Sequence, residues 1–174
     1  MPSNRHPSPV RRAIVACAVV GAVAPSAWAL DPGASAPELS LPGLNGAVDL
    51  ASLKGKVVYL DFWASWCGPC KQSFPFMNEL QSRFGADGFE VVAVNLDAKR
   101  GDADKFLAEV PARFTLAFDA KGETARQVGV KGMPTSVLID ADGKVLAVHQ
   151  GFREQDRAEL EARFVAALNR AKAP

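Results

Sequence analysis

The chain has 174 residues, 48% of them hydrophobic, and its 20 Lys and Arg nearly balance its 19 Asp and Glu. A near-neutral sequence without basic runs does not have the charge pattern of a nucleic-acid-binding surface. Beyond the first 29 residues no stretch is long and apolar enough to form a membrane helix.

Residues 1–29 have the three parts of a secretory signal peptide. Three arginines and no acidic residue precede an apolar run at 13–24, and Ala27-Trp28-Ala29 fits an A-x-A cleavage site. Twelve apolar residues are too few to span a bilayer, which takes about 20. Cleavage after Ala29 would leave 145 residues, enough for one domain with a substantial core. Because the leader removes three basic residues and no acidic ones, the mature net charge would be −2.

Three alternatives for this leader stay open: an uncleaved membrane anchor, a twin-arginine signal at Arg11-Arg12, and lipid attachment at Cys17. Sec-type export followed by cleavage is the simplest interpretation. It predicts a soluble mature protein in an oxidising compartment, where thiol chemistry is in demand. A bacterial periplasm is the expected location.

The mature chain begins with a predicted entry linker at residues 30–37, which is rich in proline and glycine. Asn45-Gly46 then separates two short alternating runs, a pattern that predicts a β-hairpin. Lys54-Gly55-Lys56 forms the turn into an apolar run, Val57 to Phe62, which predicts a buried strand.

A pair of cysteines follows this strand, in Trp66-Cys67-Gly68-Pro69-Cys70. Two cysteines three residues apart can form a structural disulfide, half of a zinc site or a redox pair. A zinc site needs about four ligands, and no second Cys or His pair completes one. A bridge across two residues would constrain the unfolded chain little. Thiol–disulfide chemistry is therefore the leading interpretation.

The spacing of the two cysteines is explained by the start of a helix. At a helix N-terminus the free N–H groups and the helix dipole stabilise a thiolate. Pro69 suits the first helical turn, and Gly68 allows the backbone to turn closely beside the sulfur. We therefore expect Cys67 to be the exposed attacking thiol and Cys70 the resolving thiol beneath it.

The rest of the chain alternates between helical and strand patterns. The expected elements are a helix continuing past Cys70 to Gly85 with Pro75 inside it, a strand at 89–96, a helix capped by Asp102 and stopped by Pro111, a strand at 114–118, a short helix at 122–128, two antiparallel strands at 137–139 and 144–149, and a helix at 154–171. Together they predict an α/β fold with a mixed central sheet flanked by helices.

The segment from Asp61 to Lys71 resembles the active-site segment of the thioredoxin superfamily. The N-terminal hairpin and the additional helix and strand between Asp97 and Asp119 are similar to the exported TlpA-like branch, the cytochrome-c-maturation type of thioredoxin. The resemblance implies a thioredoxin-like domain over residues 30–174, with its core at about 35–170, and the activity of a thiol-disulfide oxidoreductase.

The resemblance also implies a second half of the site. On its own, Gly132-Met133-Pro134-Thr135 is an ordinary loop before a strand, but thioredoxins have a cis-proline loop at this place in the order. The Met133–Pro134 bond is therefore expected to be cis, with the Met133 backbone offering strand-like hydrogen bonds to an extended substrate. The predicted substrate-binding residues are Trp66, Gly68, Pro69, Met133, Pro134 and Thr135.

Asp61 is the predicted proton handler. An acidic residue in an apolar strand should have a raised pKa if it is buried, and by resemblance Asp61 matches the acid that manages the proton of the resolving cysteine, here Cys70. The chain departs from related patterns at two positions. Ala93 stands where cytosolic thioredoxins have a lysine, and Ser73 stands where many cytochrome-c-maturation relatives have a glutamate.

The predicted function is reduction of protein disulfides without a cofactor or metal. The residues between the cysteines are Gly-Pro, with no imidazole to stabilise the thiolate, and this favours a reductant. A reductant in an oxidising compartment requires a membrane electron donor, and by resemblance its clients are apocytochrome c or copper-assembly proteins. A monomer is expected. The alternatives left open are a disulfide oxidant and a copper-binding chaperone that uses the two thiols.

Overall fold

The computed structural model describes residues 30–172, so the predicted signal peptide at 1–29 lies outside the described residues. The elements, in chain order, are β1 (Ser40–Pro42), β2 (Ala47–Asp49), β3 (Val57–Trp63), α1 (Gly68–Phe84), β4 (Phe89–Asn95), α2 (Arg100–Glu109), β5 (Thr115–Phe118), α3 (Glu123–Val128), β6 (Thr135–Ile139), β7 (Val145–Gln150) and α4 (Arg157–Lys172). Within the described range, no helix is both long and apolar enough to cross a membrane.

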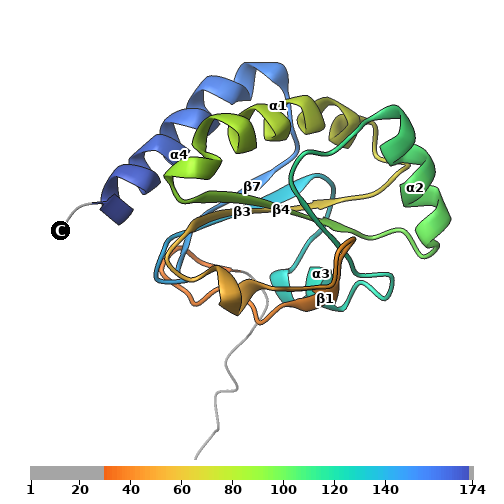
Figure 1. Ribbon diagram of the computed structural model, residues 1–174, viewed down its shortest axis with the longest axis horizontal. Helices are drawn as coiled ribbons and strands as arrows, with labels where there is room; N and C mark the ends of the chain where they lie inside the picture. The colour runs from red at the N-terminus through yellow and green to blue at the C-terminus, as the bar shows by residue number, and fades with distance from the viewer. Residues whose placement is uncertain (1–29, 173–174) are drawn as a thin grey trace, which may run out of the picture.

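A five-stranded sheet, in the order β5-β4-β3-β6-β7, forms the centre of the molecule. Strand β3 pairs in parallel with β4 and antiparallel with β6, so the sheet is mixed. Helices α1 and α4 cover one face, while α3 and the hairpin of β1 and β2 lie on the other (Figure 1). The predicted thioredoxin-like α/β fold, with its N-terminal hairpin and its helix–strand insertion of α2 and β5, is confirmed.

Strand β3 is the centre of the core because it is buried along its whole length. Its side chains alternate between two apolar clusters. Tyr59 and Trp63 join the cluster beneath α1 and α4, whereas Leu60 and Phe62 join the one on the hairpin side. A strand that is buried on both faces is normally apolar at every position. The acidic residue within β3, Asp61, therefore needs a hydrogen-bond partner in the core.

The hairpin covers the β5 edge of the sheet. Gly43 forms an isolated antiparallel bridge with Ala117. A Cβ at position 43 would lie 2.7 Å from the Val48 side chain and 3.0 Å from the Leu116 carbonyl oxygen, so only glycine allows this approach. Covering an edge strand in this way blocks uncontrolled pairing with other chains.

Three local expectations were wrong in detail. Helix α2 begins at Arg100, so Asp102 lies in its first turn and does not cap it. The C-terminal helix begins at Arg157, after a short 3₁₀ turn at Glu154–Asp156. The expected entry linker is partly sheet-like, because Ser35 forms an isolated antiparallel bridge with Lys144, which directly precedes β7. Element ends are the part of a fold that local sequence patterns determine least.

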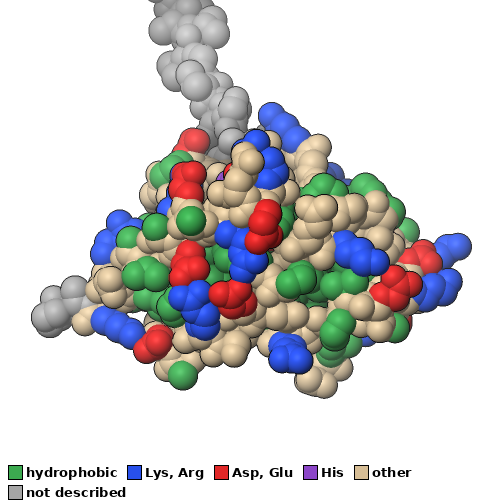
Figure 2. Space-filling view, turned by 90° about the horizontal axis from the view of Figure 1, so that it is seen from above, with side chains coloured by type: hydrophobic (Ala, Val, Ile, Leu, Met, Phe, Trp, Pro, Cys, Tyr) green, Lys and Arg blue, Asp and Glu red, His purple; other side chains and the backbone are tan. Residues whose placement is uncertain are grey.

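Charged side chains of both signs are interspersed on the face formed by α1 and α4 (Figure 2). Arg83 of α1 pairs with Glu79 at 3.0 Å and with Glu161 of α4 at 2.5 Å, and Arg157 of α4 pairs with Glu79. These exposed ion pairs join the two helices in a small network, which is worth more than isolated surface pairs.

Candidate active site

Cys67 and Cys70 form a disulfide at the N-terminus of α1. Cys67 is the N-cap residue, and the backbone N–H of Cys70 donates to its Sγ at 3.2 Å. Pro69 occupies the first turn, where its missing N–H breaks no helical bond. A sulfur that accepts a backbone N–H at the positive end of a helix is well placed to be stabilised as a thiolate.

The two sulfurs differ in access, though less than expected. Cys70 is fully buried and Cys67 is 4% exposed, so Cys67 is the more accessible but is not an exposed residue in the disulfide form. The exposed side chain here is Trp66, at 73%. An indole so open to solvent, next to a reactive sulfur, offers a flat apolar surface to an incoming polypeptide.

The Met133–Pro134 peptide bond is cis, as expected. It lies at the end of β3 that leads to the cysteines, because the next residue, Thr135, pairs with Phe62. Met133 packs against the apolar cluster that contains both cysteines. The loop is held on both sides, by a bond from Thr135 Oγ1 to the Gly132 carbonyl at 2.7 Å and by one from the Gly151 N–H to the Pro134 carbonyl at 2.7 Å.

Asp61 is buried in the middle of β3, with only 1% of its surface exposed. Desolvation raises its pKa to about 7, although a hydrogen bond from Ser136 Oγ to Oδ1, at 2.7 Å, lowers it. Among the described residues, Oδ2 has no hydrogen-bond partner. The carboxyl group can therefore exchange a proton near neutral pH through a free oxygen.

A second buried acid, Asp97, holds the turn that leads to Cys67, and sequence reasoning missed it. Its Oδ2 accepts from the Ser65 N–H at 2.9 Å and from Asn95 Nδ2 at 2.7 Å, and its Oδ1 accepts from Ser65 Oγ at 2.9 Å. We call Ser65, Asn95 and Asp97 the Asp97 cluster. The sequence signal that could have identified Asp97 is the pair of polar residues at the carboxyl end of the buried strand β4, which lies beside the end of β3.

Loss of this cluster should loosen the active-site turn. We expect Asp97→Ala to lower the free energy of unfolding by about 2–4 kcal/mol, because the partly buried donors of Ser65 and the buried donor of Asn95 lose their acceptor. The rate of disulfide exchange should fall as well. Asp104→Ala is the matched control, since Asp104 forms only an exposed pair with Arg100 and should cost about 0.5 kcal/mol or less. Denaturant unfolding and insulin reduction would measure both effects, and equal values for the two variants would contradict the assignment.

A cavity of about 360 Å³ lies directly beside Cys67. One wall is formed by the active-site turn with Trp66, and the other by Asp102, Lys105, Phe106 and Glu109 of α2. Phe106 anchors α2 here, with its ring centroid 4.9 Å from Trp63 and 5.0 Å from Phe74. The inserted helix thus shapes the approach to the reactive sulfur.

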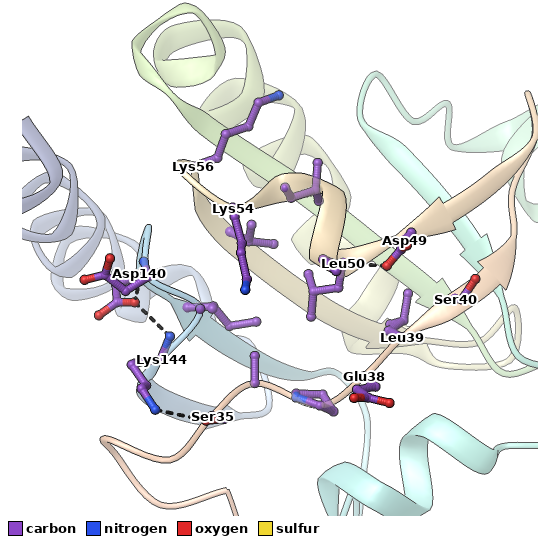
Figure 3. A pocket seen from close by; sticks show the side chains of 18 residues that line it. Ser35, Glu38, Leu39, Ser40, Asp49, Leu50, Lys54, Lys56, Asp140 and Lys144 are labelled. Carbon is purple, nitrogen blue, oxygen red and sulfur yellow. Dashed lines mark hydrogen bonds between the residues drawn. The ribbon is translucent and has the colours of Figure 1, made fainter.

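Another cavity, of about 720 Å³, lies at the opposite end of β3 and is separate from the cysteines (Figure 3). Its walls come from the N-terminal segment, the hairpin, the start of β3 and the end of β6. Its lining includes Lys54, Lys56 and Lys144 as well as Glu38, Asp49, Asp140 and Asp142, among apolar residues, so neither charge dominates. Lys144 is tied to Ser35 by a hydrogen bond of 2.9 Å.

The comparisons with known proteins agree with this geometry. A family model described as Redoxin matches residues 31–164. The thiol-disulfide oxidoreductase ResA of Bacillus thuringiensis is 38% identical over 130 residues, which cover 74% of each chain. ResA of Bacillus subtilis is 36% identical over 120 residues, which cover 68% of this chain and 67% of that protein.

Solved structures give the same result. A crystal structure from Chlorobium tepidum, proposed to be a thiol:disulfide interchange protein DsbE, is 64% identical with a TM-score of 0.79, covering 80% of this chain and 99% of that one. The thioredoxin domain of a thiol-disulfide oxidoreductase from Bacteroides vulgatus is 26% identical with a TM-score of 0.71, covering 79% and 99%. The chain therefore belongs to the Redoxin family of the thioredoxin superfamily, among the thiol-disulfide oxidoreductases of the ResA and DsbE type.

Proposed function

We propose that this protein is exported to the periplasm and there reduces disulfides of client proteins through Cys67 and Cys70. The observation that carries the proposal is the cysteine pair at the N-terminus of α1 with only Gly-Pro between the two sulfurs. The sequence features of residues 1–29 support export with these residues as a cleaved signal peptide, and residues 30–174 are the proposed thioredoxin-like domain.

The reaction begins from the dithiol form. The Cys67 thiolate attacks one sulfur of the client disulfide, forms a mixed disulfide and releases the other client sulfur as a thiolate. Cys70 then loses its proton to Asp61, and its thiolate attacks Cys67 Sγ. This step forms the Cys67–Cys70 disulfide and releases the second client thiol, so two electrons pass to the client.

Client binding uses the surfaces on both sides of Cys67. Trp66, Gly68 and Pro69 form one side, and the backbone of Met133 forms the other, where an extended client segment adds as a short strand. Pro134 and Thr135 are buried, so their part is to hold this backbone in place. Met133 is partly buried against the cysteine-containing cluster, which supports this arrangement. Each catalytic cycle leaves the protein oxidised, so a membrane protein with a reduced thiol pair must return two electrons. Apocytochrome c and copper-assembly proteins are the proposed clients, and a monomer is sufficient for the reaction.

The equilibrium reduction potential of the Cys67–Cys70 disulfide tests whether electrons flow to the client, as proposed, or from it. With Gly-Pro between the cysteines we expect a value near that of thioredoxin, about −270 mV, and far from about −120 mV of the oxidant DsbA. Titration against glutathione or dithiothreitol buffers, read by thiol alkylation, measures it. A value close to that of DsbA would reverse the proposed direction and make the protein an oxidant.

A further inference from the structure

Three buried side chains under α1 and α4 form a single hydrogen-bond chain. Tyr59 Oη donates to Ser136 Oγ at 2.7 Å, and Ser136 Oγ donates to Asp61 Oδ1 at 2.7 Å. All three residues are at most 3% exposed. Ser136 and Asp61 are direct partners in the antiparallel pairing of β6 with β3, so the backbone register places the donor opposite the acid.

The direction of this chain has a chemical consequence for Asp61. A hydroxyl that donates to a carboxylate stabilises the charged form, whereas burial among apolar groups opposes it. The Tyr59 hydroxyl donates to the Ser136 oxygen, and this bond fixes the Ser136 hydroxyl with its hydrogen directed at Asp61. The same bond polarises the Ser136 hydroxyl and makes it a stronger donor. Of the two carboxyl oxygens, Oδ1 is therefore engaged and Oδ2 has no hydrogen-bond partner among the described residues.

We propose that Ser136, held by Tyr59, is a positioning residue for proton transfer: it fixes Asp61 Oδ1, stabilises the carboxylate and leaves Oδ2 as the oxygen that accepts the proton of Cys70. The inference rests on the proposed role of Asp61 in resolving the mixed disulfide. Ser136 follows Pro134 by two residues at the start of β6. One short segment thus carries both the cis Met133–Pro134 bond, next to the cysteine-containing cluster, and the hydrogen-bond donor to the buried acid.

In any titration, the signal of Asp61 must be distinguished from those of other ionisable groups close to this hydrogen-bond chain. Tyr59 is on the same strand, where burial and the Asp61 charge raise its pKa, so it remains neutral in the relevant range. Cys70 comes from α1, and Leu160 and Phe164 of α4 join the same apolar cluster as Tyr59. His149 of β7 is the register partner of Ser136 and lies 3.9 Å from Asp156, measured between Nε2 and Oδ2. His149 therefore needs its own control.

The direct test is a ¹³C NMR titration of the Asp61 carboxyl in the oxidised protein, with Asp61→Asn identifying the signal. We expect the midpoint of Ser136→Ala to lie about one pH unit above that of the wild type, because the carboxylate loses its donor. Ser136→Thr, which keeps the hydroxyl, should restore the wild-type midpoint. Tyr59→Phe should raise it by a smaller amount, and His149→Gln should leave it unchanged. An unchanged midpoint in Ser136→Ala overturns the inference; if that variant does not fold, an unchanged midpoint in Tyr59→Phe does so.

A kinetic measurement separates this inference from the function on which it rests. The rate at which a mixed disulfide on Cys67 is resolved should show the same displaced pH profile in Ser136→Ala, again with rescue by Ser136→Thr. If Asp61→Asn leaves the resolution rate and its pH profile unchanged, the role of Asp61 fails, whatever the NMR midpoints show. If Asp61→Asn slows resolution but Ser136→Ala shifts neither profile nor midpoint, only the positioning role fails.

Discussion

Replacing Cys67 with Ser should abolish disulfide reduction, lowering kcat/KM for insulin by at least about 10³-fold, because a hydroxyl cannot replace the thiolate as nucleophile. Cys67 is the less deeply buried of the two cysteines, and its sulfur accepts the helix N–H. Its replacement therefore removes the first step and leaves Cys70, which is fully buried, without a partner.

Replacing Cys70 with Ser should also stop insulin reduction, but at a later step. The first attack remains possible, but the mixed disulfide cannot be resolved, so clients should accumulate covalently bound to Cys67. Non-reducing electrophoresis and mass spectrometry of the captured species would identify them. The double variant, Cys67→Ser with Cys70→Ser, is the control and should capture nothing. Insulin reduction at the wild-type rate in either single variant would exclude the proposed mechanism.

Replacing Asp61 with Asn should have a large effect that depends on pH. The pKa of Asp61 is raised by burial from an ordinary 3.8 to about 7. Between these values the folded protein keeps the carboxyl protonated while the unfolded chain ionises it, so the free energy of unfolding falls as pH rises from about 4 to 7. The loss is on the order of 4 kcal/mol and is complete above the folded-state pKa.

The side chain of the Asn variant cannot ionise, so its free energy of unfolding should not show this decrease between about pH 4 and 7. It should be more stable than the wild type at pH 8, with the difference shrinking toward pH 4, as measured by urea unfolding across the range. Its resolving step should nevertheless be slower, by about 10²-fold at neutral pH, because the proton acceptor is gone. Glu90→Gln is a useful control, since Glu90 lies on the neighbouring strand but pairs with Lys56 near the surface. Parallel stability curves for the wild type and Asp61→Asn would show that Asp61 does not titrate as proposed.

Much of the fold was predictable because its signals are local. Asn45-Gly46 predicted the hairpin of β1 and β2, and the uninterrupted apolar run after Lys56 predicted β3 as a buried strand. The helix start at Cys67 followed from the Gly68-Pro69 pair and the spacing of the cysteines. Boundaries were less predictable, as the start of α2 at Arg100 shows, because helix ends depend on the surrounding packing as much as on a capping residue.

By itself the sequence determined the chemistry of this protein, because two thiols at a helix start are defined by covalent spacing and backbone geometry alone. It also identified Asp61 as an unusual acid, since Asp61 is the one charged residue in the apolar strand at 57–63. The environment of that acid was decided only by the tertiary structure. Ser136 is 75 residues from Asp61 in the chain, and Asp97 is 32 residues from Ser65. The register of β6 on β3 brings Ser136 to Asp61, and the adjacent carboxyl ends of β3 and β4 bring Asp97 to Ser65. Neither arrangement follows from local propensity.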